Sequence, residues 1–210
     1  MPKIIDAYLG LMALKQAGYR TTATAVGELI DNSIEANASV IDIIAINKKV
    51  KTNGRASNNV YKIAVLDDGI GMDVDILGNC LSLGWGTRLD TRGGLGRFGF
   101  GLKGASLSQS GRVSVYSWKT PGEVYMARLD TNQIKENQSQ ELDEVVEAKI
   151  PVEIFEHFGS NILDSGTLIV WEELDLNLKR SDTLVRQLNK ELCRIYRHFL
   201  DNDDTYGKRR

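Results

Sequence analysis

The clearest pattern of hydrophobic and polar positions runs through residues 28–36, which read Glu-Leu-Ile-Asp-Asn-Ser-Ile-Glu-Ala. Each residue of an α-helix turns the chain by about 100°, so this stretch predicts an amphipathic helix. Its polar face consists of Glu28, Asp31, Asn32 and Glu35, and its opposite face of Val26, Leu29, Ile30 and Ser33. Thr21, Thr22 or Thr24 can cap the start of the helix, and Ala36 is its expected end.

Similar patterns predict the other elements. Apolar residues at helical spacing indicate helices over residues 4–17, 73–83 and 181–200, and a short helix that ends at Ser110. β-Branched or alternating stretches indicate strands over residues 40–46, 60–66, 112–118, 123–130 and 166–171. The first two strands are expected to pair antiparallel, and residues 120–122 to form a hairpin turn. Residues 48–59 are polar and are expected to form a loop, and residues 131–147 are polar and acidic and are expected to be a loop or insertion.

The polar face of the central helix has no nearby cation, because no Lys or Arg occurs between Arg20 and Lys48. An ordinary exposed helix face mixes both signs of charge and gains from pairs four residues apart. Two interpretations therefore stay open from these residues alone. The face is either an exposed acidic stripe, or a metal and water site. In the second case the Asn32 oxygen reaches a magnesium ion and Glu28, one turn earlier, polarises a water.

A second candidate site follows the strand at residues 60–66. Asp67 leaves the end of this strand and can accept a hydrogen bond from an exocyclic amine. Gly69 and Gly71 would let the backbone approach a flat ring closely. Asp-Gly is also a common turn dipeptide, so a simple turn is the alternative.

The third candidate is glycine-rich, since residues 84–104 hold eight of the chain's 20 glycines. Backbone amides at the start of the helix that follows, together with Lys103, favour an anion site. The segment is not a Walker A loop, because Leu102 precedes the lysine and no Ser or Thr follows it. Residues 99–104 match G-x-G-x-x-G, but no strand leads into them, so a Rossmann site is excluded.

The order of these motifs resembles the GHKL or Bergerat ATP-binding superfamily, which includes gyrase B, HtpG-type chaperones, MutL and histidine kinases. The resemblance covers residues 20–172 and includes a Gly-Thr pair before the last strand. In motif the chain is most similar to the MORC branch and its bacterial relatives. The resemblance implies a two-layer α/β sandwich, with a mixed, mostly antiparallel sheet, helices on one face, and an ATP lid at residues 84–97.

The resemblance also implies roles for individual residues. Glu28 matches the general base that activates water, and Asn32 matches the Mg²⁺ ligand that bridges to the phosphates. Asp67 matches the acceptor of the adenine amine. The other nucleotide-binding positions that it implies are Gly71, Met72, Thr87, Gly99, Gly101, Leu102, Lys103 and Thr167.

The function that this resemblance implies is Mg²⁺-dependent ATP binding and slow hydrolysis, with lid closure and an ATP-dependent homodimer. Residues 1–175 would form the ATP-binding domain, and residues 176–210 a helix and charged tail that lead to a transducer-like domain. One alternative is a phosphotransferase of the histidine or serine kinase type, although no phospho-acceptor histidine helix precedes the central helix. The other alternative is an interaction module that binds nucleotide without hydrolysing it.

Composition limits the partners and the cellular compartment that the sequence favours. The 210 residues are 42% hydrophobic and 26% charged, and the formal net charge of −2 gives no general attraction to nucleic acid or membranes. A nucleic-acid partner would therefore use regions outside this chain. Cys80 and Cys193 fit neither a disulfide framework nor a zinc pattern, which favours the reducing cytoplasm. No stretch approaches the roughly 20 apolar residues that span a membrane.

Overall fold

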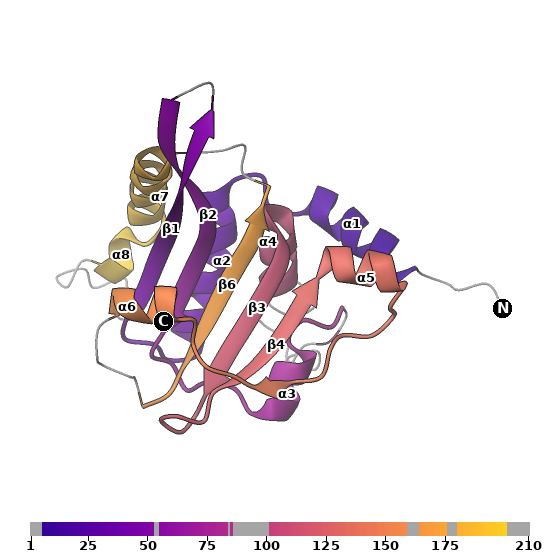
Figure 1. Ribbon diagram of the computed structural model, residues 1–210. Coiled ribbons are helices and arrows are strands. Elements are labelled where there is room, and N and C mark those ends of the chain that lie inside the picture. Colours follow the sequence, from indigo (N-terminus) through magenta and orange to yellow (C-terminus); the bar gives the residue numbers. More distant parts are fainter. Residues whose placement is uncertain are drawn as a thin grey trace.

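The computed structural model describes residues 6–52, 55–83, 85, 101–158, 164–175 and 180–200. Its centre is a six-stranded sheet with the strand order β1-β2-β6-β3-β4-β5, in which each pair of neighbours is antiparallel. The strands are β1 (Ile41–Thr52), β2 (Arg55–Asp67), β3 (Ser110–Trp118), β4 (Tyr125–Asp130), β5 (Val146–Glu147) and β6 (Gly166–Leu174). Strand β6, late in the sequence, thus lies between β2 and β3 (Figure 1).

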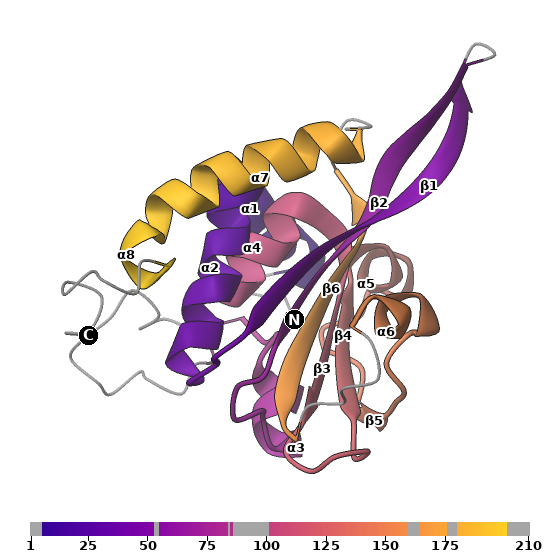
Figure 2. The ribbon, with the colours of Figure 1, turned by 90° about the vertical axis from the view of Figure 1, so that its left-hand side faces the viewer.

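Helices cover the sheet mainly on one face. The helices are α1 (Ala7–Ala17), α2 (Thr22–Glu35), α3 (Val74–Asn79), α4 (Gly101–Gln109), α5 (Thr131–Asn137), α6 (Val152–Phe158), α7 (Ser181–Ile195) and α8 (Arg197–Leu200). Seen edge-on, α1, α2, α4 and α7 lie on one side of the sheet and α6 on the other (Figure 2). The expected two-layer α/β sandwich is confirmed, with α6 added on the second face.

Each face of the sheet has its own apolar cluster because side chains alternate along a strand. In β2, Ile63 and Val65 pack toward the helices, whereas Ala64 and Leu66 pack on the opposite face. The larger cluster lies under the helices and includes the fully buried Leu29 from α2. Because both faces of β2 are buried, the middle of this strand is an almost continuous run of apolar residues.

The central helix α2 has well-defined ends. The Thr21 hydroxyl accepts a hydrogen bond from the amide of Thr24 at 3.1 Å, as expected of an N-cap. The helix stops at Glu35, and Asn37 has a positive φ of 60° just beyond it. The Asp68 carboxylate accepts hydrogen bonds from the amides of Ser39 and Val40, so the connection to β1 is fixed to the end of β2.

The prediction of a loop at residues 48–59 was wrong. Strand β1 continues to Thr52 and β2 begins at Arg55, so most of this stretch is a long antiparallel hairpin. Figure 2 shows the hairpin projecting beyond the rest of the sheet. Lys48 and Asn58 are exposed, and such polar side chains are compatible with strand pairing because the pairing uses backbone groups.

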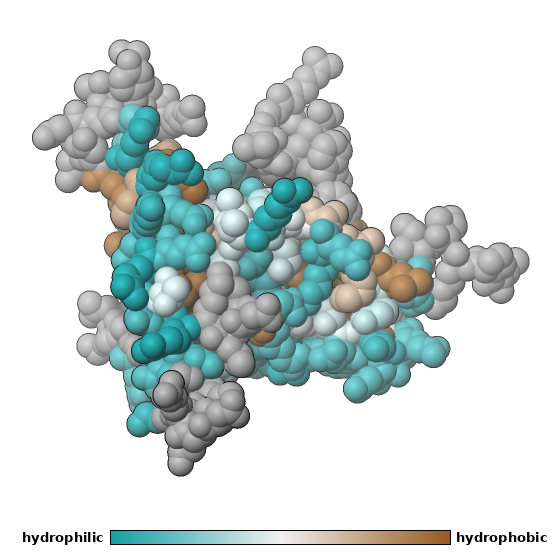
Figure 3. Space-filling model, turned by 90° about the horizontal axis from the view of Figure 1, so that it is seen from above, coloured by the Kyte–Doolittle hydropathy of each residue, from teal (hydrophilic) through white to brown (hydrophobic). Residues whose placement is uncertain are grey.

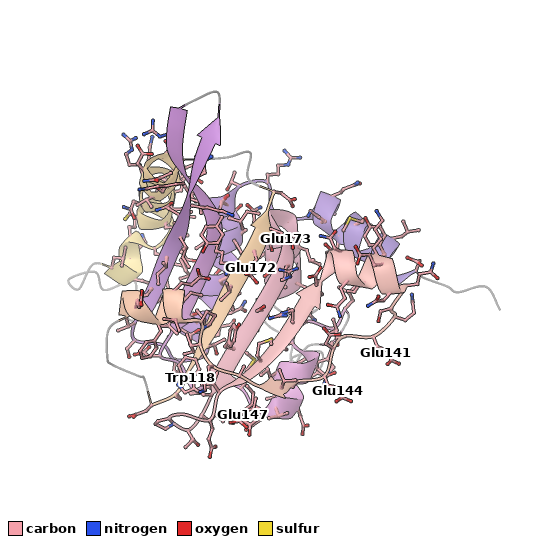
Figure 4. The ribbon with its side chains drawn as sticks, in the orientation of Figure 1. Trp118, Glu141, Glu144, Glu147, Glu172 and Glu173 are labelled. Carbon is pink, nitrogen blue, oxygen red and sulfur yellow. The ribbon has the colours of Figure 1, made fainter. Side chains whose placement is uncertain are left out.

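The prediction of a loop at residues 131–147 was wrong in part. The segment begins with α5, whose start is capped by the Asp130 carboxylate through the amides of Asn132 and Gln133. It ends with the short strand β5, which pairs with β4. Between them the chain is acidic and mostly exposed; Figure 4 labels Glu141 and Glu144 in this stretch and Glu147 in β5.

The predicted C-terminal helix is confirmed as α7 followed by α8. Its Leu184, Leu188 and Leu192 are buried, and α7 packs on α2 and on the β1–β2 edge. Ile195 and Phe199, which continue the same helical spacing, are 44% and 47% exposed. From above, hydrophilic residues cover most of the described surface, and brown patches appear near α7–α8 and near α1 (Figure 3). The boundary at residue 175 stays a prediction.

In the described part of the chain, no helix has both the length and the apolar character needed to cross a membrane.

A hydrogen bond between Trp171 and Ser106 joins the sheet to α4. The buried indole nitrogen of Trp171 donates to the Ser106 hydroxyl at 2.9 Å. We expect Ser106→Ala to lower the free energy of unfolding by about 1–3 kcal/mol, because the buried indole N–H would lose its acceptor. Urea unfolding measures the change. Ser108→Ala on the same helix should cost clearly less, and equal costs for the two variants would contradict this account.

Candidate functional site

The candidate site begins with a buried carboxylate at the end of β2. The side chain of Asp67 is 4% exposed, and it accepts hydrogen bonds from the Ser33 hydroxyl at 2.8 Å and the Gly69 amide at 3.0 Å. Burial raises the pKa of Asp67, while these bonds and one from the backbone of Thr167 oppose the rise. A partly desolvated acceptor of this kind suits a single neutral N–H donor such as an exocyclic amine.

Four residues expected around the base lie close together here. Asp67 pairs with Thr167 on the neighbouring strand β6. The Thr167 hydroxyl is 3.2 Å from the Ser117 hydroxyl, which also accepts a hydrogen bond from the Met72 amide at 2.8 Å. The loop that carries Gly71 and Met72 is therefore bound to β3, the strand next to that of Thr167.

Gly71 is required by its backbone geometry. Its φ is +66°, and a Cβ at this position would lie 2.1 Å from the carbonyl oxygen of Trp118. Trp118 lies at the end of β3, at the lower edge of the sheet in Figure 4. A side chain at residue 71 would therefore displace the loop from the sheet.

Glu28 and Asn32 lie one turn apart on α2, as the helical pattern predicted. Glu28 is half-buried, and its carboxylate lies against the first turn of α4, where a Cβ on Gly101 would be 2.6 Å from Oε2. Burial, together with the nearby Glu28 carboxylate, raises the pKa of Tyr19. Asn32 is exposed, so its amide oxygen is accessible to a ligand.

Lys103 is buried, which the sequence did not predict. Its ammonium donates to the carbonyl oxygen of Trp85 at 2.7 Å, and its side chain is 1% exposed. Burial lowers its pKa to about 8, an effect only partly offset by the nearby Cys80. A buried ammonium whose partner is a neutral carbonyl would gain from an anion placed beside it.

The remaining expected residues are placed only in part. Gly101 and Leu102 form the first turn of α4, next to Glu28 and Lys103. Thr87 and Gly99 lie outside the described residues, as does the expected lid at 84–97 apart from Trp85. The structure thus brings together Asp67, Gly71, Met72 and Thr167 as one group, and Glu28, Gly101 and Leu102 as another.

Three residues near these groups were missed as functional candidates. Ser33 was assigned to the packed face of α2, and Ser117 and Tyr19 carried no motif. The available signal for Ser33 was a small polar residue on an otherwise apolar helix face, which indicates a buried hydrogen-bond partner.

A large cavity of about 780 Å³ lies elsewhere, between α1, α3 and residues 139–145. None of the expected site residues lines it. Among the residues that the structure describes, no three His, Cys, Asp or Glu side chains gather as a metal-binding cluster.

The antiparallel sheet with helices packed mainly on one face is the Bergerat fold of ATP-binding domains. The family model described as histidine kinase-, DNA gyrase B-, and HSP90-like ATPase matches residues 19–161, more than half of the chain. The chain therefore belongs to this family, the GHKL ATPases, whose domains bind ATP.

A solved structure similar to this chain is the N-terminal domain of a DNA repair protein. The two are 22% identical with a TM-score of 0.53, and the match covers 87% of this chain and 46% of that one. This likeness shows the fold alone, and the chain spans less than half of that protein chain's length. A comparison with curated proteins gave no match.

The lowered pKa of Lys103 predicts a specific pH dependence of stability. Between about pH 8 and the ordinary value of 10.5, the unfolded chain keeps this proton and the folded protein has released it. The Lys103 contribution to the free energy of unfolding should therefore rise with pH in this window. Urea unfolding across the window should show that Lys103→Met removes this rise.

The exposed Lys190 on α7 gives the control, because Lys190→Met should follow the wild-type curve. A Lys103→Met curve parallel to the wild type would show that the ammonium is not buried.

Proposed function

We propose that this domain binds ATP with Mg²⁺ and hydrolyses it slowly. The observation that carries the proposal is the Ser33–Asp67 hydrogen bond, which joins the helix of Glu28 and Asn32 to the strand end of Asp67. Through this bond the expected base-binding acid and the expected catalytic helix belong to one rigid unit. The family membership supports ATP as the nucleotide.

The base of the nucleotide would lie against the loop at residues 69–72. The Asp67 carboxylate accepts from the exocyclic amine, and the Thr167 hydroxyl bonds the same edge of the ring directly or through a water. The closely held Gly71 leaves room for the ring, with Met72 against its face. This assignment is supported by the contacts that already link these residues across the neighbouring strands β2, β6 and β3.

The phosphates would lie at the first turn of α4. Its free amides and positive dipole end favour an anion, and the Lys103 ammonium adds a full charge nearby. Glu28 borders the same turn, so its carboxylate can orient a water in line with the terminal phosphorus and accept a proton from it. The bond from phosphorus to the bridging oxygen then breaks, and ADP leaves.

A Mg²⁺ ion fits the donors present, because hard cations favour amide and carboxylate oxygens together with phosphates and waters. Asn32 would hold the ion through its exposed amide oxygen. When bound, it would neutralise charge on the phosphates.

The finer parts of the proposal rest on the resemblance to the MORC branch. Residues 84–97 would act as the lid that orders over ATP, with Thr87 and Gly99 contacting the nucleotide. Closure would favour an ATP-dependent homodimer, and a following transducer-like domain would supply a second lysine. Nucleic acid would be a partner only through regions outside this chain.

Replacing Glu28 tests the hydrolytic assignment. We expect Glu28→Ala to retain ATP binding and to lose phosphate release by about 10²–10⁴-fold, because the attacking water would lack its base. Glu35→Gln, two turns along the same face, is the matched control and should release phosphate at the wild-type rate.

The assay compares phosphate release and oligomeric state with ATP and with a non-hydrolysable analogue. Transfer of radiolabel from ATP to a protein would favour the phosphotransferase instead. Binding with background phosphate release in a longer chain would favour the non-hydrolysing module.

Replacing Asp67 tests the base-binding assignment separately. We expect Asp67→Asn to weaken ATP binding by about 10- to 100-fold, because a charged hydrogen bond to the adenine amine would be lost. Asp68→Asn is the control, since Asp68 bonds the amides of Ser39 and Val40 instead. Calorimetry should also show that a purine triphosphate without the exocyclic amine binds wild type and Asp67→Asn alike. A similar loss with that analogue would assign Asp67 a structural role only.

A further inference from the structure

We propose that Tyr196 is a positioning residue for Glu28, because its hydroxyl fixes the turn of α2 that carries this carboxylate. The inference rests on the proposed function, in which Glu28 orients the attacking water. Tyr196 is the residue that ends α7, far from Glu28 in the sequence, and no motif marks it.

Two groups of α2 lie within hydrogen-bond distance of the Tyr196 hydroxyl. The Gly27 carbonyl oxygen and Asp31 Oδ1 each accept from it at 2.8 Å, so its single proton is shared between them. Gly27 and Asp31 are four residues apart, which makes them the two ends of one helical turn. Glu28 lies within this turn, and Asn32 follows it directly. The tyrosine thus contacts both ends of the turn that carries the expected base.

The Tyr196 hydroxyl lies directly against the backbone of α2. A Cβ on Gly27 would be 3.4 Å from the hydroxyl oxygen, so a larger side chain at residue 27 would press on the tyrosine. Tyr196 is buried, and burial together with the hydrogen bond to Asp31 raises its pKa. The hydroxyl therefore keeps its proton and remains a donor at neutral pH.

Tyr196 is itself held in place at the junction of two helices. Its amide donates to the Leu192 carbonyl at 2.8 Å, and its carbonyl accepts from the Phe199 amide at 2.9 Å, so it joins α7 to α8. Its ring packs edge-on against the ring of Phe199, with 6.2 Å between the centroids. It belongs to the same buried cluster as Leu188 of α7 and Leu29 of α2. The hydroxyl is therefore carried by a packed pair of helices.

A fixed turn limits where the Glu28 carboxylate can lie, because the backbone sets the starting point of the side chain. A misplacement of about 1 Å in a catalytic group can cost about a hundredfold in rate. Without the hydroxyl, the exposed Asp31 can turn to solvent, and the turn loses this attachment to α7. Loss of the hydroxyl should therefore slow the chemical step.

ATP affinity should not depend on the Tyr196 hydroxyl. The expected acceptor of the adenine amine, Asp67, is held by Ser33 and Gly69, which both lie outside this turn. The Lys103 ammonium comes from α4. The positioning role thus predicts a lower rate constant at unchanged affinity, whereas general loosening of the domain would weaken both.

The experiment compares Tyr196→Phe with Tyr61→Phe. Tyr196→Phe keeps the buried ring and removes only the hydroxyl. Tyr61→Phe is matched, because the Tyr61 hydroxyl also donates to a carboxylate, that of Glu153 at 2.6 Å, in α6 on the opposite face of the sheet. We expect Tyr196→Phe to lower the rate constant for phosphate release about tenfold at unchanged ATP affinity. Tyr61→Phe should leave both quantities unchanged. A wild-type rate constant in Tyr196→Phe, or a loss confined to ATP affinity, overturns the positioning role.

A double-mutant cycle with Asp31→Ala shows whether the effect passes through this contact. Either single substitution removes the hydrogen bond between the two side chains, so the double variant should lose less than the product of the two single losses. Losses that multiply in the double variant show that Tyr196 and Asp31 act separately, which overturns the proposal.

Hydrogen exchange in the nucleotide-free protein tests the contact without hydrolysis. The amides of residues 28–32 should exchange faster in Tyr196→Phe and at the wild-type rate in Tyr61→Phe. Unchanged exchange in Tyr196→Phe overturns the fixing of the turn. Background phosphate release from a longer wild-type chain would instead overturn the proposed hydrolysis, and with it the catalytic part of this inference.

Discussion

The hydrogen bond between the Ser33 hydroxyl and the Asp67 carboxylate joins the helical layer of the domain to the sheet. The carboxylate that accepts it is buried. A carboxylate without hydrogen bonds is costly in such a place, so Asp67 constrains every element that supplies it with a donor. Those donors come from α2, from the loop after β2 and from β6. Because Ser33 fixes the rotation of α2, the positions of Glu28 and Asn32 follow from the same bond.

Much of the fold could be predicted from local patterns, and the errors have a common cause. The helical period around Leu29 and the apolar run of β2 are strong because both elements bury their side chains. The hairpin between Asn47 and Asn59 is polar because it projects from the sheet, and its strands exist through backbone pairing with each other. Strands that are held by backbone pairing alone leave no pattern of apolar residues in the sequence. Helix α5 was missed for a related reason, because only Thr131 and Ile134 on it are buried.

The candidate site could be predicted as a set of motifs, but its supporting contacts could not. Asp67 and Thr167 are a hundred residues apart in sequence, and only the strand order brings them to one register. The Ser117 hydroxyl that joins Met72 to this pair has no recognisable spacing from either of them. The burial of Lys103 could not be predicted from the sequence either. Its glycine-rich surroundings are as compatible with an exposed lysine as with a buried one.

The base-binding end and the phosphate end of the candidate site differ in how well their polar groups are already paired without nucleotide. At the base-binding end, Asp67 already has its hydrogen bonds from Ser33 and Gly69, so an adenine amine would add one contact to an ordered acceptor. At the phosphate end, Lys103 has a neutral partner and a lowered pKa, so the charged ammonium is the costly form there. An arriving triphosphate would favour that charged form. By linkage, ATP binding should then take up a proton at Lys103 near its pKa of about 8, and the binding energy would include the cost of charging this buried side chain.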